Sequence, residues 1–208
     1  MNLKRWFFLF WSCMLIGAAV SITVGLMMQW TDQSFGFMGL EATGFNALMM
    51  GLAGLLIGAF SQMGFFAYLS LNYVALGVLR RQYLWNALQA YTTVFALFVL
   101  GYILYMDRGN LNGWMFWALP LALAAASWLV AFVKVKKTNA TAFVPTMFLM
   151  VVVTSLEAWP AIRGDSNAAA IVFMMAPLFV CNAYQILMLH RLVASKTAES
   201  AAKAESTV

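Results

Sequence analysis

The residues that could do chemistry in this sequence are few and widely separated. There is one histidine, His190, and the two cysteines, Cys13 and Cys181, each lie inside an apolar stretch. A zinc, haem or iron–sulfur site needs several such ligands, and a Ser-His-Asp triad needs a histidine beside its nucleophile. Nucleotide-binding, metalloprotease and nucleophile-elbow motifs are also missing from the sequence. We therefore predict a non-enzymatic protein with no cofactor and no metal, whose cysteines are buried free thiols.

Glu157 is the acidic residue nearest to an apolar core, at the end of the stretch 143–156. Ionisable groups inside a membrane are costly, and where they occur they mark ion or proton pathways. We interpret Glu157 as a carboxylate at the outer membrane interface. A coupling site in a small-solute or ion transporter or channel is the alternative.

Amide side chains, rather than charges, lie within the apolar stretches. Asn86 and Gln89 share one helical face, and so do Asn182 and Gln185. An amide in hydrocarbon is costly without a partner, so we expect these side chains to face each other. We also expect Gln62 to hydrogen-bond one of them. Such a polar cluster either only holds the helices together by hydrogen bonds or forms a pocket that faces a partner.

The composition indicates which elements position these residues. Of the 208 residues, 64% are hydrophobic and 9% are charged, whereas soluble domains carry about 25% charged residues. Six apolar stretches are long enough to cross a bilayer as helices, with approximate bounds 6–28, 45–68, 84–106, 114–133, 141–159 and 168–189. The predicted fold is all-α, a polytopic six-transmembrane-helix bundle over residues 1–192. Residues 193–208 are predicted to be a disordered or weakly helical cytoplasmic tail.

The second apolar stretch is too long for a simple crossing. Residues 45–79 would form a helix of about 52 Å, against a hydrocarbon core of about 30 Å. Either this helix protrudes, or it crosses by Tyr68 and residues 69–79 lie along the inner interface. We favour the second arrangement, because 69–79 is apolar and ends at Arg80 and Arg81.

Basic residues are distributed unequally between the two sides of this predicted bundle. Ten of the twelve Lys and Arg residues fall on the side that holds both termini. The positive-inside rule then predicts a multi-pass protein of the cell (plasma) membrane with cytoplasmic N- and C-termini. Residues 80–83 and 134–140 would be inside, and 31–44, 107–113 and 161–167 outside. The net charge of +5 suits anionic membrane lipid, and no nucleic-acid partner is needed to explain it.

Small residues recur at helical spacing in the first two spans, where they allow helix backbones to approach closely. They are Gly17, Ser21 and Gly25 in the first span, and Gly51, Gly54, Gly58 and Ser61 in the second. We expect helix-packing seams within this chain, with dimerisation as the alternative. The sequence leaves the oligomeric state open.

The run from Ser61 to Leu69, SQMGFFAYL, is followed by Leu84-Trp85-Asn86. This pattern resembles the KinB-signalling pathway activation protein family (KbaA), small polytopic membrane proteins of spore-forming bacilli. The resemblance implies a protein without catalytic residues that helps to activate a membrane sensor histidine kinase feeding the sporulation phosphorelay. The implied partner is that kinase or its regulators. Besides the amides, the candidate partner-facing residues are Gly64, Phe65, Phe66, Tyr68 and Trp85.

Overall fold

The computed structural model describes residues 3–31, 42–106, 114–164 and 168–205, and these described residues form helices and short turns without a strand. Six helical segments are long and apolar enough to cross a membrane. The predicted all-α fold with six candidate spans is therefore confirmed. Of the predicted outer connections 31–44, 107–113 and 161–167, residues 32–41, 107–113 and 165–167 lie outside the described residues. So do the side chains of 190–205, His190 among them.

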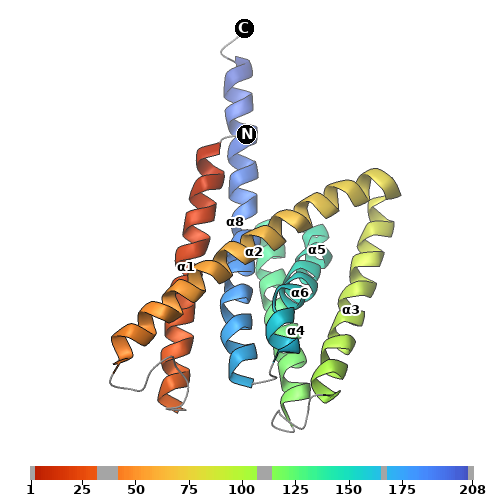
Figure 1. The fold of residues 1–208 in the computed structure, drawn as a ribbon. Coiled ribbons are helices and arrows are strands. Elements are labelled where there is room, and N and C mark those ends of the chain that lie inside the picture. Colours follow the sequence, from red (N-terminus) through yellow and green to blue (C-terminus); the bar gives the residue numbers. More distant parts are fainter. Residues whose placement is uncertain (1–2, 32–41, 107–113, 165–167, 206–208) are drawn as a thin grey trace.

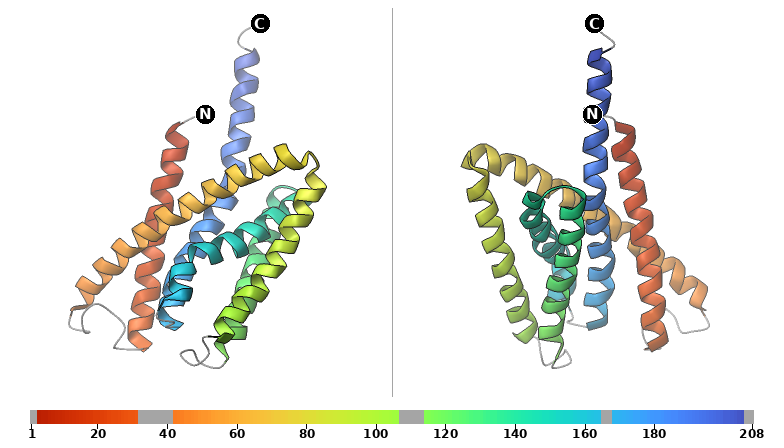
Figure 2. Two further views of the ribbon diagram at one scale, coloured as in Figure 1. Left: turned by 45° about the vertical axis from the view of Figure 1, so that its right-hand side comes forward. Right: turned by 180° about the vertical axis from the view of Figure 1, so that it is seen from behind.

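Two groups of helices make up the bundle (Figures 1 and 2). In the first group, α1 (Leu3–Thr31) runs beside α8 (Ala168–Glu205), and α2 (Thr43–Leu79) crosses both obliquely. In the second group, α3 (Gln82–Met106) lies beside α4 (Met115–Lys137). The helix α8 continues to Glu205, into the stretch for which we expected a disordered or weakly helical tail.

The helix α2 runs unbroken from Thr43 to Leu79, through the point near Tyr68 where we expected it to divide. No proline or glycine occurs between Tyr68 and Leu76, so nothing in the chain interrupts the helical hydrogen bonds there. The helix ends at Arg80, which has left-handed backbone angles (φ 54°) and donates its N–H to the Leu76 carbonyl at 3.2 Å. The strong inclination of α2 (Figure 1) accommodates part of its length.

The fifth span is assembled from short pieces that connect the two groups. It consists of the 3-10 turn η2 (Ala140–Ala142), then α5 (Phe143–Phe148), the π-helical segment η3 (Leu149–Val153) and α6 (Thr154–Glu157). The chain turns at Ala158 and continues as α7 (Trp159–Arg163), with Pro160 in its first turn. π-Helical turns occur frequently at functional sites.

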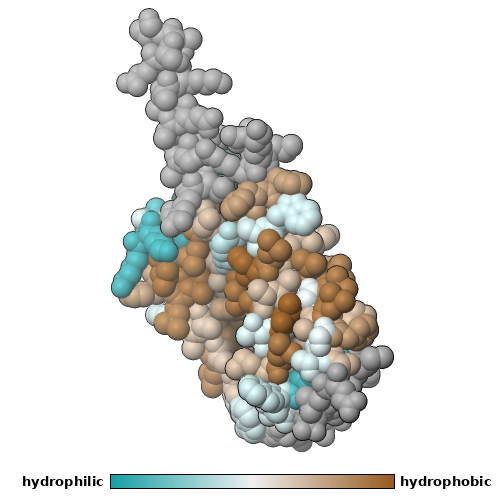
Figure 3. All heavy atoms as spheres, turned by 90° about the vertical axis from the view of Figure 1, so that its left-hand side faces the viewer, coloured by the Kyte–Doolittle hydropathy of each residue, from teal (hydrophilic) through white to brown (hydrophobic). Residues whose placement is uncertain are grey.

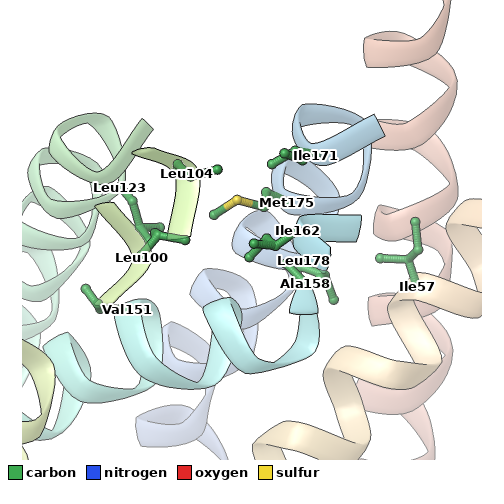
Figure 4. Packing of buried hydrophobic residues seen from close by; sticks show 10 residues of the cluster. All are labelled: Ile57, Leu100, Leu104, Leu123, Val151, Ala158, Ile162, Ile171, Met175 and Leu178. Carbon is green, nitrogen blue, oxygen red and sulfur yellow. The ribbon is translucent and has the colours of Figure 1, made fainter. Parts of the chain in front are cut away.

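An apolar core fills the space between α3, the fifth span, α7 and α8 (Figure 4). Its members include Leu100, Leu104, Val151, Ile162 and Met175. On the outside, apolar residues (brown) cover much of the coloured part of the face in Figure 3, and Phe98 and Val78 are each 74% exposed. A folded chain with this outer surface is an integral membrane protein.

Candidate functional site

The contact between α1 and α2 is made by backbone against backbone. A Cβ added to Gly54 would lie 2.6 Å from Cα of Ala18, and one added to Gly58 would lie 2.8 Å from Cα of Met14. A Cβ on Gly17 would meet the Gly54 carbonyl. Only glycine permits this approach, so these residues fix the crossing point of the two helices.

The remaining small residues flank this crossing point on both helices. Ser21 is fully buried against Gly54, and a Cβ on Gly51 would lie 3.1 Å from Cδ1 of Ile22. A Cβ on Gly25 would overlap the side chain of Met50. The close contact therefore extends along α1 and α2 in both directions from Gly54.

Next to this contact, a cluster of buried polar side chains joins α1, α2 and α8. Gln185 Nε2 donates to Ser61 Oγ at 2.8 Å and to Cys13 Sγ at 3.0 Å. Ser61 Oγ in turn donates to Asn182 Oδ1 at 2.9 Å. Ser61, Asn182 and Gln185 have no exposed surface. We call the residues Cys13, Ser61, Asn182 and Gln185, with Glu157 and Thr154 described next, the polar cluster.

The fifth span completes the polar cluster through Glu157. Asn182 Nδ2 donates to Glu157 Oε2 at 2.7 Å and to Thr154 Oγ1 at 3.0 Å. The carboxyl group occupies the place where a larger residue at position 64 would put its side chain, since a Cβ on Gly64 would overlap Glu157 Oε1. Gly64 is therefore the residue that admits this carboxyl group between α2 and α8.

Our interpretation of Glu157 as an outer-interface carboxylate needs correction. Its partner Asn182 lies fourteen residues after Ala168, about 21 Å along α8 at ~1.5 Å per residue. The reason is the shape of the fifth span, in which α6 ends at Glu157 and α7 provides the remaining path toward the start of α8. Hydropathy alone places a helix end at the membrane surface and cannot detect such a turn within the bundle.

The two cysteines are free and buried, and the structure brings them together from positions 168 residues apart. The Cys181 thiol donates to the Cys13 carbonyl at 3.4 Å, and the Cys13 thiol donates to the Gly58 carbonyl at 3.7 Å. Beside them, the Tyr184 hydroxyl donates to Ser12 Oγ at 3.0 Å. These contacts attach α1 to both α2 and α8.

The other amides do not join the polar cluster. Gln62 and Gln89 are fully buried. Gln62 has no hydrogen-bond partner among the described residues, and Gln89 lies beside the Tyr68 hydroxyl, away from the cluster. The expectation that Gln62 bonds an amide of the third or sixth helix is therefore wrong. Asn86 is partly buried and takes no part in these hydrogen bonds. Adjacent positions on a helix point about 100° apart, so Ser61 reaches Asn182 whereas Gln62 does not.

Most aromatic residues of the recognised run face inward, which corrects their interpretation as partner-facing. Phe65, Tyr68 and Trp85 are buried. The rings of Tyr68 and Trp85 lie 6.0 and 6.3 Å from that of Phe148, measured between centroids. Phe66, 40% exposed, does reach the surface, where its ring lies 5.2 Å from that of Trp6.

Sequence reasoning missed Thr154, Glu157 and Cys13 as members of the polar cluster. One signal was available, because Thr154 and Glu157 are three residues apart and share a helical face, as Asn182 and Gln185 do. Among the described residues, no three His, Cys, Asp or Glu side chains gather as metal ligands would.

Residues 17–192 match the family KbaA, described as KinB-signalling pathway activation in sporulation. The chain belongs to this family. It is also 34% identical over 199 residues to the KinB-signaling pathway activation protein of Bacillus subtilis (strain 168), and the alignment covers 93% of this chain and 98% of that relative. No solved structure matches the chain. The resemblance that we identified from the run Ser61–Leu69 is thereby confirmed.

Proposed function

We propose that this KbaA-family protein helps to activate the KinB signalling pathway in sporulation, as a membrane accessory protein without enzymatic activity. The observation that carries the proposal is the family match over residues 17–192, together with similarity to the Bacillus subtilis relative along almost the whole of both chains. The transporter alternative has no support from these comparisons.

The shape of the molecule supports contact within the membrane or at its inner surface. The turn between α2 and α3 consists of Arg80 and Arg81 alone, and the one between α4 and η2 of Thr138 and Asn139. These two connections are therefore too short to form a separate binding domain. We propose a membrane sensor kinase or one of its regulators as the partner, with membrane lipid around the rest of the surface.

Within the molecule, we assign the activity to the group of α1, α2 and α8 held by the polar cluster. Interhelical hydrogen bonds of this kind are individually weak, on average about 0.6 kcal/mol in measured cases. A network of them can therefore be rearranged at modest cost, which suits an element that responds to a partner. The exposed ring of Phe66 lies on the same group and is our candidate for direct contact.

Deletion of the gene in its own host tests the proposed function. We expect reduced sporulation and reduced kinase-dependent phosphorylation of the phosphorelay, with both restored by the chain supplied in trans. A normal phosphorelay together with a defect in the uptake of a solute would contradict the proposal and favour a transporter.

The proposed orientation, with both termini cytoplasmic, rests on the distribution of Lys and Arg. In a background that lacks Cys13 and Cys181, single cysteines at positions 110 and 136 can be exposed to a membrane-impermeant thiol reagent in intact cells. We expect position 110 to react and position 136 to be protected until the cells are lysed. Labelling at 136 but not at 110 in intact cells would reverse the orientation.

A further inference from the structure

The carboxyl group of Glu157 lies between α2 and α8 in a partly buried residue, and its two oxygen atoms have different surroundings. Oε2 accepts one hydrogen bond, from Asn182 at 2.7 Å. Oε1 is buried against Gly64 and Val153 and has no hydrogen-bond partner among the described residues. A carboxylate anion normally accepts several hydrogen bonds, so this environment is poorly suited to one.

Among the described residues, no Lys or Arg side chain pairs with Glu157, and the buried Lys134 ammonium donates instead to the Ile186 carbonyl of α8 at 2.6 Å. The titratable groups that face it are the thiols of Cys13 on α1 and Cys181 on α8, whereas α2 contributes Ser61 and Gly64, which do not titrate. The nearest cation along the chain is Arg163, whose guanidinium lies over the Trp159 ring at 5.5 Å. An unpaired anion at this depth would be costly, because neither lipid nor the surrounding side chains replace its hydration.

The hydrogen bonds of the polar cluster run in one direction and end at this carboxyl group. Gln185 donates to Ser61, Ser61 donates to Asn182, and Asn182 donates to Glu157. Asn182 thus presents its amide nitrogen, not its oxygen, to the carboxyl group. A hard metal ion such as Ca²⁺ takes about six to eight oxygen ligands, whereas a proton needs only one.

We propose that Glu157 is a proton-binding site inside the membrane, and that in this arrangement its carboxyl group is the neutral acid. The proton resides on Oε1, while Oε2 accepts the hydrogen bond from Asn182. Release of the proton would place a full negative charge beside Gly64 and would draw the Asn182 amide toward it. The bonds from Asn182 to Thr154 and Ser61 would then change, so proton occupancy is coupled to the contacts between α2, α6 and α8.

Infrared spectroscopy of the full-length protein in lipid nanodiscs tests this proposal directly. The sequence has seven Asp and Glu residues, and Glu157 alone lies within a predicted span. The other six carboxyl groups lie outside the predicted spans, where we expect water to keep them ionised at neutral pH. We expect the C=O stretching band of a protonated carboxyl group at neutral pH, shifted by ¹³C-glutamate labelling and lost in Glu157→Gln.

The labelled parent protein keeps the test decisive even if Glu157→Gln does not accumulate, because the isotope shift assigns the band to glutamate and Glu157 is the one glutamate in a span. A neutral-pH spectrum with carboxylate bands alone would overturn the proposal. A carboxylate band whose position depends on whether Na⁺ or K⁺ is present would overturn it in favour of a metal-cation site.

Discussion

The two groups of helices in this molecule are held together in different ways. The contact of α1, α2 and α8 combines glycine-mediated backbone contacts at Gly54 and Gly58 with the hydrogen bonds of the polar cluster. The contact between α3 and α4 is looser, and a groove of about 580 Å³ opens between them, lined by aromatic and aliphatic side chains. Gly101 borders this groove, and a Cβ added there would meet its nearest neighbour at 3.8 Å.

This difference shows which interactions define helix positions in a membrane. Lipid chains are as apolar as leucine, so an apolar contact between helices competes with an equivalent contact with lipid. Close backbone packing has no such substitute, because lipid chains cannot replace the contact between two helix backbones. The glycine contact therefore fixes how α1 and α2 cross, whereas the groove between α3 and α4 leaves room for larger side chains.

The largest expected effect comes from a bulky side chain at the α1–α2 crossing. Gly58→Leu would force Met14 and Cys13 backbone atoms away from α2, at a cost of about 3 kcal/mol, the upper end for overpacking, because a clash with backbone cannot be relieved by a rotamer change. Gly101→Leu, the matched control, extends into the groove and should behave like the parent. Folded protein in the membrane is measured by accumulation and thermal stability. Parent-like accumulation of Gly58→Leu would show that the two contacts are equally tolerant.

A smaller effect is expected where α2 meets Glu157. Gly64→Ala places a methyl group where Oε1 of Glu157 lies, so the carboxyl group must move and the bond to Asn182 should be lost. Gly77→Ala on the same helix meets no atom within 4 Å and gains helix propensity of about 0.5–1 kcal/mol. Thermal stability should fall for position 64 and hold or rise for position 77. Equal changes at both positions would mean that Glu157 is not held as described.

The smallest effect on stability is expected for Gln62→Leu. Gln62 is buried without a hydrogen-bond partner among the described residues, so leucine of similar size removes no bond and relieves an unsatisfied amide. Stability should be unchanged or slightly higher. If buried Gln62 nevertheless supports the function of the Ser61–Leu69 run, signalling should fall at a near-normal protein level. Unchanged signalling in the double variant Gln62→Leu, Asn86→Leu would remove both residues from the functional site.

The sequence predicts the elements of this fold better than their ends and bends. Apolar length and the absence of charge are sufficient to predict six spans, because backbone satisfaction in lipid requires helices of a minimum length. The spacing of small residues predicts which faces of the first two helices pack, and in the structure Gly54 lies against Gly17 and Ala18. The unbroken α2 and the turn at Ala158 depend on contacts with neighbouring helices. Local sequence composition carries no information on those contacts.

From the sequence we predicted that buried polar side chains would form a cluster, but not which residues would belong to it. The cost of a buried amide indicated that polar side chains would meet, and Asn182 and Gln185 do so through Ser61. Which amide meets which depends on helix rotation, so Gln62, one position from Ser61, has no such partner. Glu157 entered the site because the fifth span ends early, and a hydropathy pattern has no signal for that.

The central claim, that the polar cluster and not the α3–α4 group carries the pathway activity, can be tested with two matched serines. Ser61 links Gln185 to Asn182, whereas Ser127 on α4 is equally buried and its hydroxyl has no partner among the described residues. Each Ser→Ala variant, expressed at the parent level, is assayed for kinase-dependent phosphorylation of the phosphorelay. We predict a clear reduction for Ser61→Ala and parent-like phosphorylation for Ser127→Ala. Parent-like phosphorylation in Ser61→Ala, or an equal loss in both variants, would contradict the claim.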